Sequence, residues 1–127
     1  MQVAEIIGEL VMADDIEQVA EIRLNGTVET KVSHEIVSFD DKKCTCVEAI
    51  NEHKGRPQMC LYYDGSSAPG LTFWQIIQQL SPYSPYQEVE IVLDGEVHGE
   101  AFKTESSEVL HGFYERKNGT RYAEFYF

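Results

Sequence analysis

An internal repeat is the feature of this sequence that most restricts the folds open to it. Residues 3–28 and 73–97 align with a one-residue gap. The matched pairs are Ile6–Ile76, Ile7–Ile77, Leu10–Leu80, Gln18–Gln87, Glu21–Glu90, Ile22–Ile91, Leu24–Leu93, Gly26–Gly95 and Val28–Val97. Self-similarity at such a period indicates two copies of one supersecondary unit. The chain therefore predicts a duplicated architecture.

Each copy opens with a pattern that is typical of a short amphipathic helix. Apolar residues follow the i, i+3, i+4, i+7 spacing in 3–10 and again in 73–80, which places them on one helical face. In the second copy Thr72 is a suitable N-cap with Gln75 three residues later, and Ser81-Pro82 ends the helix. Two helices are therefore predicted.

A hairpin is predicted after each helix. Alternating apolar and polar residues around Ile22 and around Ile91 predict strands. Asn25-Gly26 and Asp94-Gly95 follow these strands and predict tight turns, because Asn, Asp and Gly tolerate positive φ. The returning strands are then expected over 28–39 and 97–103.

A second hairpin is predicted to close each copy. Its strands are expected at 44–52 and 57–63 in the first copy, and at 107–116 and 120–127 in the second. The predicted fold class is α+β, with two pseudo-repeated α-β-β-β-β units whose antiparallel sheets each pack one helix. The units span 1–63 and 72–127 within a single domain, and the Gly- and Ser-rich stretch 64–71 is the predicted linker. Two arrangements remain open: two sheets packed about a pseudo-twofold axis, or one continuous longer sheet.

The net charge of −12 limits the partners of this chain. Such a field repels nucleic acid phosphates and anionic membranes, so we expect no direct binding to either. No run approaches the roughly 18 apolar residues of a membrane span, and the N-terminal residues do not resemble a signal peptide. We therefore expect a cytoplasmic monomer or dimer with a basic protein as its partner.

Cys44, Cys46, His53 and Cys60 are candidate metal ligands, because their side chains suit zinc. A two-residue turn at Lys54-Gly55 would place Cys60 opposite Ala49, on the other face of the hairpin from Cys44 and Cys46. The predicted geometry therefore favours reduced cysteines and no metal. An odd number of cysteines also argues against a disulfide framework.

Enzymatic chemistry has little support in the sequence. The chain has no nucleophile elbow, phosphate-binding loop, dinucleotide fingerprint or zinc-protease motif. Its four histidines, His34, His53, His98 and His111, show no pattern that predicts convergence with a carboxylate. We therefore expect a non-enzymatic protein without a cofactor.

Aromatic residues in the last hairpin suggest a protein-binding surface. Pairing around Asn118-Gly119 predicts Tyr114 opposite Ala123 and thus facing the core. The same register places Phe113, Tyr122 and Tyr126 on the opposite, outer face. Tyr and Phe are enriched at interface cores, so these three residues are candidate partner-binding residues.

Acidic residues cluster in the helix and first hairpin of each copy. The acids expected around the helix ends and first hairpins are candidate partner-binding residues: Asp14, Asp15, Glu17, Glu88, Glu90, Asp94 and Glu96. A surface of this kind steers cationic partners and raises their association rate. Charge reversal at Glu88 and Glu90 is expected to weaken binding more than reversal at Glu5 and Glu9.

The stretch from Leu80 to Ile91, LSPYSPYQEVEI, followed by Asp94-Gly95, resembles small acidic proteins of phages and mobile elements. That group includes anti-CRISPR and other anti-defence inhibitors, some of which occupy nucleic-acid channels with carboxylates. The resemblance implies an acidic inhibitor that mimics nucleic acid against a basic groove. The alternatives are an immunity protein that neutralises a basic toxin, or a structural or interaction module of a phage or mobile element.

Overall fold

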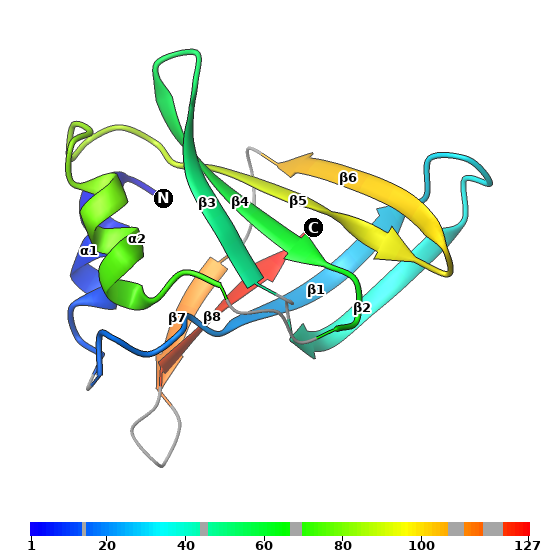
Figure 1. The fold of residues 1–127 in the computed structure, drawn as a ribbon, viewed down its shortest axis with the longest axis horizontal. Coiled ribbons are helices and arrows are strands. Elements are labelled where there is room, and N and C mark those ends of the chain that lie inside the picture. The colour runs from blue at the N-terminus through cyan, green and yellow to red at the C-terminus, as the bar shows by residue number, and fades with distance from the viewer. Residues whose placement is uncertain (14, 44–45, 67–69, 107–110, 116–120) are drawn as a thin grey trace.

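Two helices and eight strands make up the described parts of the chain, which has the predicted α+β fold class (Figure 1). The structure is a computed structural model that describes residues 1–13, 15–43, 46–66, 70–106, 111–115 and 121–127. The helices are α1 (Val3–Leu10) and α2 (Phe73–Leu80). The strands are β1 (Ile22–Glu29), β2 (Ile36–Lys43), β3 (Cys46–His53), β4 (Arg56–Tyr63), β5 (Glu90–Val97), β6 (Glu100–Ser106), β7 (His111–Glu115) and β8 (Arg121–Tyr126).

Both helices form where the apolar spacing predicted them. In α2 the side chain of Thr72 accepts a hydrogen bond from the Gln75 amide at 3.1 Å, and the Gln75 side chain accepts one from the Thr72 amide at 3.0 Å. This reciprocal cap satisfies donors that the first helical turn leaves unpaired. Neither α1 nor α2, the helices within the described ranges, has a long enough apolar stretch to cross a membrane.

The prediction that each unit forms its own antiparallel sheet is wrong. The strand orders are β2-β1-β8-β7 and β3-β4-β5-β6, and the central pairs β1–β8 and β4–β5 are parallel. Each sheet thus combines the first hairpin of one half of the chain with the closing hairpin of the other half. The two sheets face each other across one hydrophobic core, and both helices close one end of it (Figure 1).

The turns predicted at Asn25-Gly26 and Asp94-Gly95 are also wrong, because both pairs lie inside strands. The glycines serve a different purpose there. A Cβ on Gly26 would lie 2.1 Å from the Phe127 carbonyl oxygen, and a Cβ on Gly95 would lie 1.8 Å from that of Tyr63. Glycine therefore permits close backbone approach at both sites.

The first closing hairpin, in contrast, was predicted correctly. Strands β3 and β4 pair around Lys54 and Gly55, whose φ values are 53° and 77°. Cys60 pairs with Ala49, as expected from a two-residue turn. Positive φ at both turn residues matches the right-handed twist of the flanking strands.

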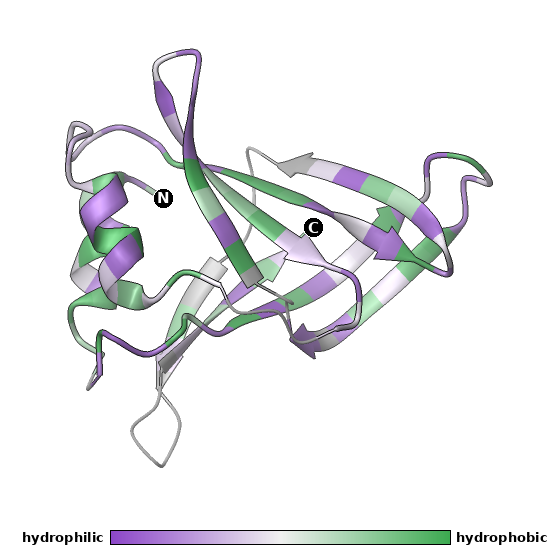
Figure 2. Cartoon of the chain, viewed as in Figure 1, coloured by the Kyte–Doolittle hydropathy of each residue, from purple (hydrophilic) through white to green (hydrophobic). Residues whose placement is uncertain are grey.

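The core is built from the inward-facing residues of both sheets and both helices. Leu24, Leu61 and Leu93 are fully buried on the central strands. The Phe39 ring bridges the sheets, with ring centroids 4.9 Å from Tyr63 and 6.0 Å from Phe102. Hydrophobic and hydrophilic residues alternate along several strands, as expected when one sheet face is buried (Figure 2).

Candidate functional site

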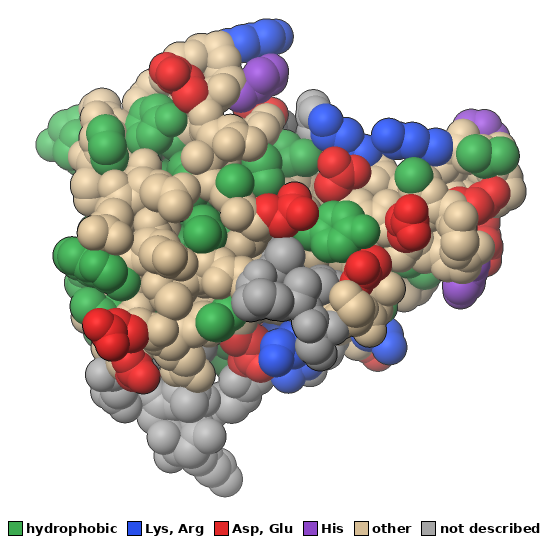
Figure 3. Space-filling model, viewed as in Figure 1, with side chains coloured by type: hydrophobic (Ala, Val, Ile, Leu, Met, Phe, Trp, Pro, Cys, Tyr) green, Lys and Arg blue, Asp and Glu red, His purple; other side chains and the backbone are tan. Residues whose placement is uncertain are grey.

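The best candidate site is the outer surface of the β3-β4-β5-β6 sheet. On β5 the residues Ile91, Leu93 and Val97 point inward and are buried. Asp94 and Glu96 alternate with them and are exposed on the outer side. Figure 3 shows acidic side chains gathered over β4 and β5 in the middle of the view.

Tyr62 lies at the centre of this surface, paired with Asp94 across the parallel β4–β5 ladder. Desolvation raises the pKa of its hydroxyl, and the negative field of nearby carboxylates raises that pKa further. The carboxylates that act on it are Asp64, Glu96, Glu48 and Asp94. We call Tyr62, Glu48, Asp64, Asp94 and Glu96 the acidic face.

Cys60 lies beside the acidic face but is not activated for nucleophilic chemistry. Desolvation by burial raises the pKa of its thiol above 9.0, with further increases from Glu48 and Asp94. Asn51 and Lys103 act in the opposite direction. A thiolate is the nucleophilic form of cysteine, so this environment keeps Cys60 in its less reactive form.

Of the candidate zinc ligands, Cys44 and the side chain of Cys46 lie outside the described residues. Within the described ranges, no three His, Cys, Asp or Glu side chains are placed to hold a metal ion. Instead, Nδ1 of His53 lies 3.1 Å from Oε2 of Glu90.

The predicted acidic residues do not form one site. Glu90 contacts His53, and Glu88 accepts a hydrogen bond from the Met1 amino group at 3.1 Å, so both carboxylates are engaged by other residues of the chain. Asp15 and Glu17 lie in the segment after α1, where Asp15 Oδ1 accepts from the Glu17 amide at 3.0 Å. Asp14 lies outside the described residues. Of the predicted set, Asp94 and Glu96 are the exposed members on the acidic face.

The aromatic face predicted on the last hairpin is correct for Tyr122 and Tyr126 but wrong for Phe113. Phe113 pairs with Ala123 and packs against the core, and the Tyr114 ring stacks on Tyr122 with centroids 5.6 Å apart. The register is shifted by one residue from the predicted one, which exchanges the two faces of β7. Tyr114 therefore belongs to the outer face in place of Phe113.

Comparison of the chain with protein-family models, curated proteins and solved structures found no match.

An apolar pocket lies between the helices and the sheets, and apolar side chains line it. Ile6, Phe73, Ile76, Phe113 and Phe125 are among them. This lining offers no acid, base or nucleophile, so the described residues place no catalytic group there.

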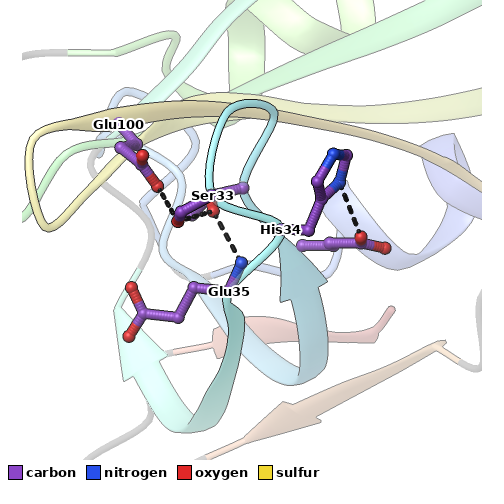
Figure 4. A network of polar contacts seen from close by, with 6 residues as sticks. Ser33, His34, Glu35 and Glu100 are labelled. Atoms are coloured by element: carbon purple, nitrogen blue, oxygen red, sulfur yellow. Dashed lines mark hydrogen bonds and ion pairs between the residues drawn. The ribbon is translucent and has the colours of Figure 1, made fainter.

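A network of polar contacts that includes a histidine–carboxylate pair at His34 lies instead at the turn between β1 and β2 (Figure 4). Nδ1 of His34 lies 3.0 Å from Glu29, and Nδ1 of His98 lies 3.0 Å from Glu35. Sequence reasoning missed the contact between His98 and Glu35, because His98 comes from the β5–β6 turn and Glu35 from the β1–β2 turn. The network therefore joins the two sheets at the end of the molecule away from the helices.

Ser33 is the central donor of this network. Its hydroxyl donates to Glu100 Oε2 at 2.5 Å and lies 3.1 Å from Thr30 Oγ1, which accepts from the Glu35 amide at 2.9 Å. In Figure 4 Glu100 and His34 lie on opposite sides of the turn. Hydrogen bonds from Ser33 and Thr30 hold the pKa of Glu100 below its usual 4.5.

We expect Glu100→Gln to lower the urea midpoint of unfolding at pH 7. A depressed carboxyl pKa in the folded state stabilises the fold above the unfolded pKa, and this stabilisation disappears as pH falls through the folded pKa. The difference from the wild-type midpoint should therefore shrink at pH 3. The group is exposed, so the effect should be small. Glu52→Gln, at an exposed carboxyl near the end of β3, is the control and should leave the urea midpoints at pH 7 and pH 3 unchanged. If the effect of Glu100→Gln on the midpoint grew as pH falls, the lowered pKa of Glu100 would be contradicted.

Proposed function

We propose that this protein is a non-enzymatic inhibitor that binds a basic protein through its acidic face. The observation that supports this best is the pairing of Tyr62 with Asp94 on the outer side of the β4–β5 ladder, where Asp64, Glu96 and Glu48 also lie close enough to act on the Tyr62 hydroxyl. The partner we propose is a nucleic-acid-handling enzyme of the host cytosol, such as a CRISPR effector. The resemblance to small acidic anti-defence proteins of phages points the same way.

The physical basis is electrostatic mimicry. Alternate residues on one face of a strand are about 6.8 Å apart, so Asp94 and Glu96 present a regular row of negative charge. Carboxylates in place of phosphates would engage Arg and Lys and release counterions in the same way. Tyr62 adds a partly buried aromatic ring at the centre, and tyrosine is enriched among the residues that dominate binding energy at interfaces.

The face also carries a positive residue that would shape its specificity. Lys103 pairs with Asp94 across the antiparallel β5–β6 ladder. A partner must therefore present its cations over β4 and β5, away from the β6 edge. Basic residues along that edge would meet like charge, which disfavours a wrongly oriented complex.

The test is capture of a partner from host lysate at low and high salt, with the wild type and two charge-reversal variants. Asp94→Lys/Glu96→Lys should weaken capture about 100-fold. Asp40→Lys/Glu52→Lys makes the same change in net charge at exposed positions off the face and should weaken it only slightly. Added polyanion and high salt should release the partner. Salt-independent capture, or equal losses in both variants, would refute the proposal.

We also propose that the two halves are copies of one unit that have exchanged their closing hairpins. If β1 and β2 are matched with β5 and β6, and β7 and β8 with β3 and β4, the strand order β2-β1-β8-β7 becomes β6-β5-β4-β3. This is the order of the other sheet, read from its opposite edge. The parallel registers support the same alignment, since Ile22 pairs with Ala123 as Ile91 pairs with Met59.

A further inference from the structure

Exposed apolar side chains gather where the end of α1 meets the start of α2. The residues after α1 run along the first turn of α2, because the Trp74 amide donates to the Ile16 carbonyl at 2.7 Å and Phe73 donates to Gln18 at 3.1 Å. Val11, Met12, Val19 and Trp74 are 54%, 63%, 45% and 44% exposed. We call these four residues the Trp74 patch.

The Trp74 patch has the character of a binding surface for a partner. Single exposed apolar residues are common, but adjoining ones mark interaction sites. The patch lies over the helices, apart from the acidic face on β4 and β5. It is also far from Val32 and Ile36, which are exposed near the β1–β2 turn at the other end of the molecule (Figure 1).

The charge around the patch determines which partner fits. Residues 1–22 and 57–102 contain no Lys or Arg, and Asp15 and Glu17 are exposed in the segment that carries the patch. In Figure 3 hydrophobic and acidic side chains adjoin at the edge over the helices. A second copy of this chain would bring these acids against one another, so charge disfavours a dimer through this surface.

We propose that the Trp74 patch binds a basic amphipathic helix of a partner protein. An apolar stripe of that helix would cover Val11, Met12 and Trp74, and its Lys or Arg residues would lie over Asp15 and Glu17. In the recognition of an amphipathic helix, apolar anchors supply affinity and flanking charges supply orientation. The inference does not depend on the acidic face, because it concerns a separate surface.

Trp74 provides the readout, since it is the single tryptophan of the chain. The probe is a synthetic helix-forming peptide of Leu and Lys with Leu at i, i+3, i+4 and i+7. Its titration should shift the Trp74 emission to shorter wavelength in a saturable way, because binding removes the ring from water. Two control peptides, one with Glu in place of Lys and one with the Leu–Lys order scrambled, should produce no saturable shift.

Variants that keep Trp74 locate the binding surface. Val11→Asn/Met12→Gln should weaken peptide binding about tenfold. Val32→Asn, at an apolar residue that is 78% exposed, should not weaken it. Asp94→Lys/Glu96→Lys should leave the Trp74 shift intact even where it abolishes partner capture, which separates this inference from the proposed function.

Three results would overturn the inference. They are the absence of a shift with the basic peptide, an equal shift with the acidic peptide, and loss of binding in the Asp94→Lys/Glu96→Lys variant. Light scattering that shows a dimer dissociated by Val11→Asn/Met12→Gln would assign the patch to self-association instead.

Discussion

Gly95→Ala is expected to lower the free energy of unfolding by about 4 kcal/mol, among the largest effects of any single substitution in this chain. The new Cβ would lie 1.8 Å from the Tyr63 carbonyl oxygen and 3.1 Å from the Phe102 ring. Tyr63 is held in the parallel β4–β5 ladder and Phe102 is fully buried, so neither can move without loss of other contacts. The β4–β5 pair, which joins the two halves of the chain, would have to separate locally.

Urea unfolding followed by circular dichroism measures this effect, and Gly8→Ala is the matched control. Gly8 lies inside α1 and is exposed, with nothing within 4 Å of a Cβ built on it. The same chemical change there should stabilise the protein by about 0.5–1 kcal/mol, because alanine favours a helix over glycine. Equal effects of the two substitutions would show that Gly95 does not lie against the β4 backbone.

Phe39→Ala is expected to lower the free energy of unfolding by about 3–5 kcal/mol. The ring is 5% exposed and packs edge-on against Tyr63 and at an angle to Phe102, so its removal breaks contacts between the two sheets. Aromatic pairs of this kind contribute roughly 0.5–1.5 kcal/mol beyond the area that they bury. The cavity left behind would add to that cost.

Two further substitutions distinguish packing from a general sensitivity of β2. Phe39→Leu keeps part of the buried volume and should cost distinctly less than Phe39→Ala. Ile36→Ala, on the same strand at a residue that is 71% exposed, should change the stability by no more than about 0.5 kcal/mol. A large loss from Ile36→Ala would mean that this side chain is covered in solution.

Part of the candidate site could be predicted from the sequence. The alternation of Val89, Ile91 and Leu93 with polar residues correctly predicted a strand whose Ile91 and Leu93 are buried, because side-chain direction in a strand follows a period of two. Asp94 was expected in a turn, and its outward position on β5 was not predicted. Tyr62 was missed as the centre of the acidic face. Its position beside Asp94 depends on a parallel pairing between β4 and β5 that no short-range pattern indicates.

The errors have two causes. Asn25-Gly26 and Asp94-Gly95 have the composition of a tight turn, yet their glycines accommodate a neighbouring backbone from the other half of the chain. Phe113 was assigned to the outer face because the register of β7 and β8 was counted from an assumed turn, and a shift of one residue reverses the faces. In the first case the missing information was the identity of a distant neighbour, and in the second it was the register of the β7–β8 hairpin.

Local preferences in the amino-acid sequence were enough to determine the two helices, the β3–β4 hairpin and the buried Ile91 and Leu93 of β5, because these depend on backbone dihedrals and on periodicity within one segment. The pairing of each first hairpin with the closing hairpin of the other half, the parallel central pairs and the position of Tyr62 beside Asp94 arose only when distant segments packed together. The physical reason is that strand pairing is selected by the shared burial of two segments, a property that neither segment has alone.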